Sequence, residues 1–205
     1  PPKLVPNSRQ GLHLLYMDLC GPMQIANINE KRHVLVIMDD YSCYTLVHFL
    51  RSKDEAPEVI KTFLKRITIL LQSLVIIIRI DNGTKFKNQV LKEYFDSVGI
   101  SHQESSVRTP QQNGVVERRN RTLVEAARTM LIFSHAPLFL WAEAIATACF
   151  TQNCFIIHRR FNKTPYKLIN DRKPDISFLH VFGALCYPKN DREDIGKLGA
   201  KGDIG

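Results

Sequence analysis

The alternation and the length of the apolar runs along this chain predict a mixed α/β domain. Short apolar or alternating runs, most of them closed by a turn signal, predict strands at residues 12–19, 33–39, 43–50, 75–80 and 100–104. Apolar positions at helical spacing predict helices at residues 53–71, 87–98, 114–133 and 138–157. Because strands alternate with helical crossovers, we expect a mixed sheet with helices packed on it.

The two ends of the chain differ in composition from the middle. Residues 1–11 are rich in proline and polar residues, which is typical of a linker, and residues 12–173 carry the periodic pattern of a core domain. After Pro174, residues 178–187 (FLHVFGALCY) fit one or two strands, and the last residues are charged and rich in glycine. We expect residues 174–205 to be the start of a truncated β module.

Three carboxylates stand at the ends of predicted elements. Asp81 directly follows the apolar run 75–80, Asp18 comes near the end of the first predicted strand, and Glu117 lies at the start of the helix at 114–133. Carboxylates brought together repel one another, and a divalent cation offsets that repulsion. Magnesium favours such a sparse set of oxygen ligands, which leaves positions for water and substrate phosphate. Taken singly, each acid could also be a helix cap or a surface residue.

Four motifs carry a resemblance to a known family. In order, they are residues 16–22 (YMDLCGP), 36–42 (VIMDDYS), 79–84 (RIDNGT) and 109–118 (TPQQNGVVER). Together they resemble the integrase core of copia-type LTR retrotransposon polyproteins, from about Leu12 to the end of the chain. The chain departs from the family pattern at Lys85, where an acid is usual, and at Ile80, where a small polar residue is common.

The resemblance implies a fold, a chemistry and a set of partners. The implied fold is ribonuclease H-like, a mixed five-stranded sheet flanked by helices, followed in the family by a small SH3-like barrel, of which residues 174–205 would be the start. The implied catalytic and metal-binding residues are Asp18, Asp81 and Glu117, holding Mg²⁺ or Mn²⁺, with two ions expected. The implied activity is metal-dependent DNA 3′-end processing and strand transfer, with element-end DNA and target DNA as substrates. A homo-oligomer acting in the nucleus, after a cytoplasmic virus-like particle, is the corresponding expectation.

Charge and cysteine usage fit this interpretation. The net charge of +8 and the isoelectric point of about 9.3 favour a polyanionic partner. The five cysteines have no paired spacing and form no cluster with histidine, so we expect reduced thiols and no structural zinc. No apolar run reaches the roughly 18 residues of a membrane span, so no membrane partner is expected.

The residues around Glu117 are the candidates for DNA contact. Arg121 lies four residues after Glu117, on the same helix face, and could hold a phosphate or simply form a salt bridge with Glu117. Arg118 and Arg119 point elsewhere and could contact target DNA or only water. The remaining predicted DNA-binding residues are Asn120 in the helix and Gln111, Gln112 and Asn113 in the loop before it.

Other acids of the chain fit structural roles, and two other functions are compatible with the sequence. Asp39 and Asp40 fit hairpin turn chemistry, while Glu143 and its neighbour Trp141 fit the core or edge of an apolar helix. A nuclease of the same fold is one alternative, because fold and metals do not define the substrate. A catalytically inactive DNA-binding or assembly fragment of a degenerate element is the other.

Overall fold

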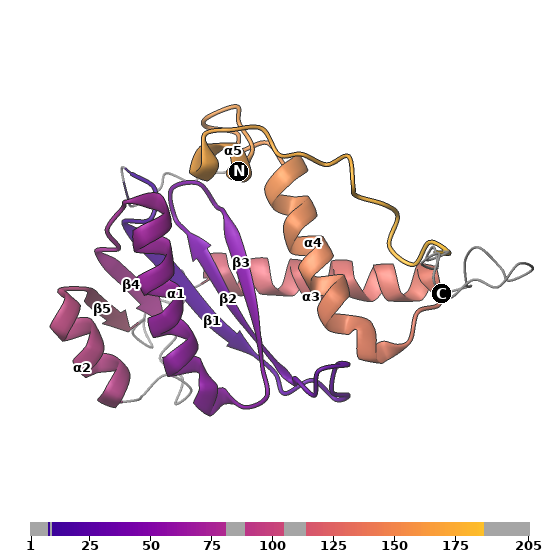
Figure 1. Cartoon of the computed structure of the whole chain (residues 1–205), viewed down its shortest axis with the longest axis horizontal. Helices are drawn as coiled ribbons and strands as arrows, with labels where there is room; N and C mark the ends of the chain where they lie inside the picture. Colours follow the sequence, from indigo (N-terminus) through magenta and orange to yellow (C-terminus); the bar gives the residue numbers. More distant parts are fainter. Residues whose placement is uncertain (1–7, 9, 81–88, 105–113, 187–205) are drawn as a thin grey trace, which may run out of the picture.

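The protein folds as a single sheet with a layer of helices on each face (Figure 1). The computed structural model describes residue 8 and residues 10–80, 89–104 and 114–186 of the 205-residue chain. The strands are β1 (Leu14–Cys20), β2 (His33–Asp39), β3 (Thr45–Leu50), β4 (Ile77–Ile80) and β5 (Ser101–Glu104). They lie in the order β3-β2-β1-β4-β5, with β2 antiparallel to β1 and β3, and with β4 parallel to β1 and β5.

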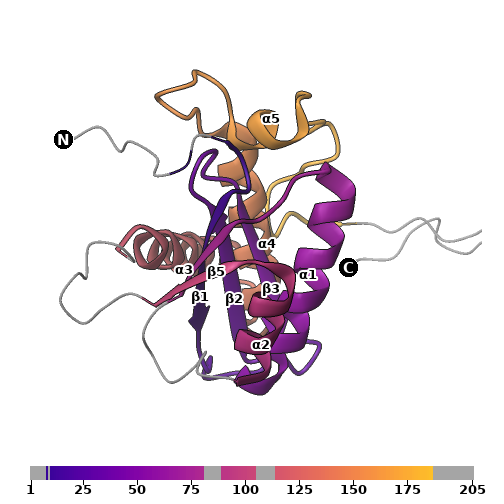
Figure 2. The ribbon, with the colours of Figure 1, turned by 90° about the vertical axis from the view of Figure 1, so that its left-hand side faces the viewer.

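The helices divide between the two faces (Figure 2). The main helices are α1 (Ala56–Leu71), α2 (Gln89–Val98), α3 (Gly114–Ser134), α4 (Trp141–Phe155) and the short α5 (Pro165–Asn170). One-turn 3-10 helices precede α1 and α4, at Lys53–Glu55 and Leu138–Leu140. None of the helices within the described ranges has the length and apolarity that a membrane crossing needs.

The period-two alternation of β1 decides which side chain enters which core. Leu15 and Met17 point to the face covered by α1 and α2, whereas Leu14 and Tyr16 pack on the face covered by α3 and α4. Asp18 has the same parity as Tyr16. The alternation therefore places the Asp18 carboxylate on the α3 face of the sheet.

A buried asparagine of α4 fastens this helix to the edge strand β3. The Thr45 N–H donates to Asn153 Oδ1 at 2.9 Å, and Asn153 Nδ2 donates to the Thr45 carbonyl at 2.7 Å. The side-chain amide thereby satisfies two outward-facing backbone groups that an edge strand would otherwise expose. Because Asn153 is only 5% exposed, this pair of bonds fixes the α4 layer on the sheet.

Each predicted strand and helix of the core is present, with ends shifted by a few residues, and the predicted fold class is confirmed. The sequence prediction missed α5, although Thr164 caps it by accepting from the Lys167 N–H and Pro165 occupies its first turn.

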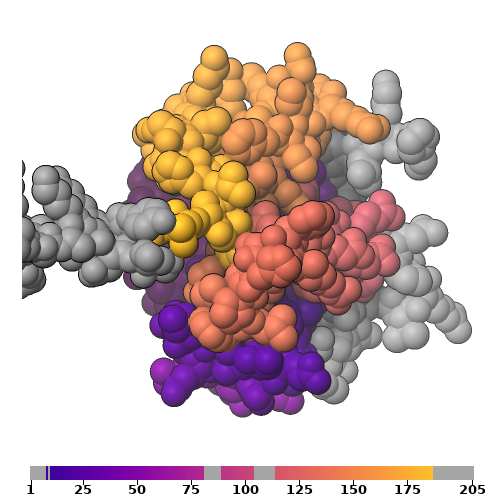
Figure 3. Space-filling model, turned by 90° about the vertical axis from the view of Figure 1, so that its right-hand side faces the viewer, coloured from indigo at the N-terminus to yellow at the C-terminus, as the bar shows by residue number. Residues whose placement is uncertain are grey.

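The strands expected within 178–187 are not formed in the described part of that segment, residues 178–186. Phe178 instead packs against Phe150 of α4, with ring centroids 5.9 Å apart, and Phe182 packs on the α3–α4 core. The segment lies on the molecular surface over these helices (Figure 3). Its apolar side chains pack singly on helices and not across a partner strand, which explains the difference. A separate module beginning at residue 174 stays a prediction.

Candidate active site

Asp18 is held at the carboxyl-terminal part of the central strand β1. It is half-buried, and its Oδ2 accepts a hydrogen bond from Asn120 Nδ2 of α3 at 2.9 Å. This contact joins residues 102 positions apart in the sequence. The α3 helix thus lies close enough to β1 to orient this carboxylate.

The strand leading to Asp81 is the parallel neighbour of β1. The last residue pair between the two strands joins Met17 to Ile80, and these residues directly precede Asp18 and Asp81. The strands that lead to Asp18 and Asp81 are therefore adjacent in the sheet. Asp81 itself lies outside the described residues, so the convergence of its carboxylate on Asp18 stays a prediction.

Glu117 lies in the first turn of α3 with an exposed side chain. It is three residues before Asn120, and residues at that spacing are neighbours on a helix surface. Since Asn120 reaches Asp18, α3 carries Glu117 to the same region of the sheet as Asp18. Among the described residues no ion pair joins Glu117 to Arg121, so the salt bridge weighed for this pair is not formed.

The three arginines that follow Glu117 differ in their surroundings. Arg118 and Arg121 are exposed, whereas the half-buried Arg119 donates from Nη1 to Gln152 Oε1 of α4 at 2.6 Å. Arg119 therefore links α3 to α4, and its predicted contact with DNA is untested. The other predicted DNA-binding residues, Gln111, Gln112 and Asn113, lie outside the described residues, as does Lys85.

Asn120 has a role that sequence reasoning missed. Its side chain is 7% exposed and its amide nitrogen is bonded to Asp18, while its predicted contact with DNA stays a prediction. Its carbonyl oxygen, Oδ1, is buried without a hydrogen-bond partner among the described residues. A buried carbonyl without a hydrogen-bond partner destabilises the folded state. A contribution to stability alone therefore does not explain why an asparagine stands at this position. In the sequence, the three-residue spacing between Glu117 and Asn120 was the signal that Asn120 lies near the proposed site.

The donor set fits a hard divalent cation. Asp18 and Glu117 are carboxylates, and the Asp18 oxygen Oδ1 has no hydrogen bond among the described residues. The residue that holds Asp18, Asn120, also carries a buried oxygen without a partner among the described residues. These oxygens are the ligand type that magnesium and manganese prefer. Within the described ranges no group of three acidic, histidine or cysteine side chains forms a metal site, and Asp81 is not within those ranges.

Asp39 is the other buried carboxylate and serves the turn after β2. It accepts hydrogen bonds from the Leu12 N–H at 2.8 Å and from the N–H and the hydroxyl of Ser42 at 2.9 and 2.5 Å. Burial raises the pKa of Asp39, and the bonds from Ser42 and Leu12 oppose that rise. The prediction that this acid belongs to turn chemistry is confirmed.

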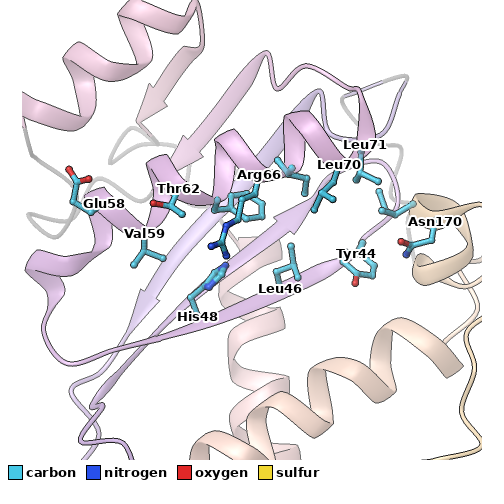
Figure 4. A pocket seen from close by; sticks show the side chains of 13 residues that line it. Tyr44, Leu46, His48, Glu58, Val59, Thr62, Arg66, Leu70, Leu71 and Asn170 are labelled. Atoms are coloured by element: carbon cyan, nitrogen blue, oxygen red, sulfur yellow. The ribbon is translucent and has the colours of Figure 1, made fainter.

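An apolar groove on the opposite face of the sheet is separate from this cluster (Figure 4). It has a volume of about 720 Å³ and lies between α1 and β3, with Leu46 and His48 on its strand side. Burial, with a smaller effect of Arg66, lowers the pKa of His48. Because these side chains point away from the α3 face, the groove cannot share a reacting group with Asp18.

Comparisons with known proteins agree with this architecture. The model of the family described as "Integrase core domain" matches residues 9–110. The retrovirus-related Pol polyprotein from transposon TNT 1-94 of Nicotiana tabacum is 33% identical over 190 residues, which are 93% of this chain and 14% of that protein. The corresponding polyprotein from transposon RE1 of Arabidopsis thaliana is 30% identical over 182 residues, 89% of this chain and 12% of that protein. This chain therefore spans about one seventh or less of these relatives.

Two solved structures share the fold. The HTLV-2 integrase catalytic core domain in complex with magnesium, in its trimeric form, has a TM-score of 0.59 at 22% identity, covering 80% of this chain and 99% of that one. The simian T-cell lymphotropic virus intasome, in complex with the PP2A regulatory subunit B56 gamma, gives a TM-score of 0.62 at 18% identity, covering 95% and 68%. Both structures support the ribonuclease H-like fold. With its family match, its polyprotein relatives and its sheet, this chain belongs to the integrase core domain family, as its resemblance to copia-type integrases predicts.

Proposed function

We propose that this chain catalyses metal-dependent processing of DNA 3′ ends and their transfer into target DNA. Membership of the integrase core family supports DNA integration in general. The observation that carries the specific chemistry is the bond from Asn120 to Asp18, because it fixes a carboxylate on the face that α3 approaches with Glu117 one turn away.

The alternation of β4 supports Asp81 as the third carboxylate. Ile77 packs on the α3 face and Arg79 bonds to Tyr16 on that same face, whereas Ile78 and Ile80 lie in the α1–α2 core. If the alternation continues for one more residue, the side chain of Asp81 points to the α3 face. Asp18, Asp81 and Glu117 would then be the three ligands of the site.

Each residue has a defined part in this proposal. Asp18 and Asp81 would hold a divalent cation between two adjacent strands, and Glu117 would complete the site from α3. The bound cation would offset the carboxylate charge and stabilise the negative charge that develops during phosphoryl displacement. Asn120 orients Asp18 through one oxygen and leaves the other oxygen available.

One site can serve both steps of the reaction, because both are displacements at a phosphodiester. Water attacks in 3′-end processing, and the DNA 3′-hydroxyl released by that step attacks the target strand in transfer. The chain needs no nucleophilic side chain for either step, since the cation that the carboxylates would hold would orient the oxygen nucleophile and the phosphate.

The proposed partners are element-end DNA and target DNA, bound by a homo-oligomer in the nucleus. The solved structures that share the fold include dimeric and trimeric magnesium-bound cores and an intasome. The chain's charge of +8 is the feature of its own that favours DNA.

The test is a strand-transfer assay with paired-end DNA and Mg²⁺, comparing Asp81→Asn with Asp96→Asn. Asp96 is an exposed acid of α2, so it provides the same chemical change away from the proposed site. We expect Asp81→Asn to lose processing and joining while keeping its unfolding midpoint, and Asp96→Asn to retain both activities. Processing without joining in the unchanged protein would favour a nuclease. Magnesium-independent DNA binding without either reaction would favour an inactive binding fragment.

A further inference from the structure

We propose that Arg79 binds a backbone phosphate of the DNA strand next to the phosphate that reacts at Asp18, and that Tyr16 positions its guanidinium. This inference rests on the proposed function, because it concerns how the same site holds its substrate.

Two neighbouring strands hold the Arg79 side chain. Its Nε donates to Gln103 Oε1 of β5 at 2.9 Å, and its Nη1 donates to the Tyr16 hydroxyl of β1 at 3.2 Å. The guanidinium carbon also lies 5.8 Å from the centroid of the Tyr16 ring. Arg79 on β4 is thus fixed from both sides of its strand, which lowers the conformational entropy lost when the guanidinium binds a ligand.

No described carboxylate forms an ion pair with Arg79, although the side chain is half-buried. The nearest acid in its network is Asp40, whose Oδ1 accepts from the Tyr16 hydroxyl at 3.1 Å. The terminal nitrogen Nη2 has no hydrogen bond to any described residue, and it is the donor that this proposal assigns to the phosphate.

Next to Arg79, two described side chains of β5 are exposed. The α3 helix packs on β1 and β2, and the side chains of Ser101 and Gln103 on β5 are exposed. By the alternation of β5, Ser101 lies on the same face as Gln103. We therefore infer that the substrate strand approaches the guanidinium from the β4–β5 part of this face, where β4 and β5 form the end of the sheet opposite β3 (Figure 2).

The sheet register sets the position of Arg79 relative to the reacting phosphate. Arg79 pairs with Tyr16, two residues before Asp18 on the same strand and the same face. Two strand residues span roughly 7 Å, a separation that a neighbouring phosphate of one polynucleotide strand can bridge. A planar guanidinium with a free donor edge suits a phosphate better than a neutral base.

The test measures binding of the full 205-residue chain to an element-end DNA duplex by fluorescence anisotropy in EDTA, across a salt series. We expect Arg79→Gln to weaken binding about tenfold or more. We also expect it to reduce the log–log salt slope by about 0.9, the value for one phosphate contact. Arg66→Gln is the matched control, since Arg66 is an exposed arginine of α1 on the opposite face.

Two further variants separate charge from positioning. Arg79→Lys should restore the salt slope but not the full affinity, because it keeps the charge without the guanidinium plane. Tyr16→Phe should weaken binding severalfold with an unchanged slope, since it removes only the hydroxyl that holds Nη1. If Arg79→Gln fails to fold, the Arg79→Lys and Tyr16→Phe pair still carries the test.

DNA in which a neutral methylphosphonate replaces the phosphate next to the reacting one identifies the phosphate that Arg79 contacts. The difference between the unchanged protein and Arg79→Gln should vanish on that modified DNA and persist when the methylphosphonate lies elsewhere. Equal binding and equal slopes for Arg79→Gln and Arg66→Gln would overturn the inference, even if Asp81→Asn abolishes strand transfer. Conversely, a full Arg79 effect together with an active Asp81→Asn variant would refute the proposed catalytic site and leave this contact standing.

Discussion

Replacing Asn120 with alanine tests whether this buried amide serves the fold or the site. The change removes the bond from Nδ2 to Asp18 Oδ2 and also removes the unpartnered oxygen Oδ1. A hydrogen bond to a charged group contributes about 1.5–3 kcal/mol, and a buried group without a partner costs about 1–3 kcal/mol. The two effects offset each other, so Asn120→Ala should change the free energy of unfolding by only about 1 kcal/mol or less.

A second buried asparagine provides the matched comparison. Asn153 is as buried as Asn120, with 5% against 7% exposure, but both ends of its amide are bonded to Thr45. Asn153→Ala leaves the N–H and the carbonyl of Thr45 without partners, at a cost of about 1–3 kcal/mol for each group. Urea unfolding in EDTA should therefore show a much lower midpoint for Asn153→Ala than for Asn120→Ala.

Asn120→Ala should weaken magnesium binding more than Asn153→Ala does, the reverse of their order in stability. Without Asn120 the Asp18 side chain regains rotamer freedom, and fixing such a side chain costs about 0.5–1.5 kcal/mol. Magnesium affinity, measured by calorimetry, should fall about two- to tenfold for Asn120→Ala. Equal destabilisation by the two alanine substitutions, or an unchanged magnesium affinity, would refute a positioning role for Asn120.

Three other properties can be predicted from the described contacts. Arg119→Ala should lower the free energy of unfolding by about 1 kcal/mol, because it breaks the hydrogen bond to Gln152 of α4. Arg118→Ala should leave the urea midpoint unchanged, because Arg118 is exposed, and should only make DNA binding less salt-dependent. Burial raises the pKa of the Asp39 carboxyl, so the folded state holds this proton more tightly than the unfolded chain does. The resulting contribution to the free energy of unfolding is fully present below the ordinary pKa of Asp and is lost as the pH rises through the raised pKa. Asp39→Asn should remove that step from urea midpoints measured between about pH 3 and pH 7. Burial raises the pKa of Cys149 to about 12, so iodoacetamide should label the exposed Cys186 in the native protein and reach Cys149 only after unfolding.

The local pattern of the sequence was enough to predict the core of the fold. The apolar run before Asp81 and the alternating run before Asp18 became β4 and β1, and the helical periodicities became α1 to α4. These signals are strong because burial of one face forces the same period on the sequence. The parallel pairing of β1 with β4 is not contained in the local pattern, because it joins residues 63 positions apart in the sequence.

The side-chain bonds between distant elements were beyond sequence reasoning. The bond from Asn120 to Asp18 and the bond from Arg119 to Gln152 depend on how closely α3 lies to β1 and α4. Spacing along α3 showed that Asn120 and Glu117 share a side, but it could not show which residue turns inward. An exposed and a buried polar residue on one helix look alike until the neighbouring layer is in place.

The register between β1 and β4 determines both which side chains of β4 enter the hydrophobic core and which face the proposed site. In the observed register Ile78 and Ile80 enter the α1–α2 core, while Arg79 bonds to Tyr16 on the α3 face. Reversing the faces of β4 would expose both isoleucines and bury the arginine away from its hydroxyl partner, since side chains alternate with a period of two. Burial of the two isoleucines alone contributes a few kcal/mol at about 25 cal/mol per Å². The hydrophobic core therefore holds Arg79 on the face where Asp18 lies, without any stabilising contact from the site itself.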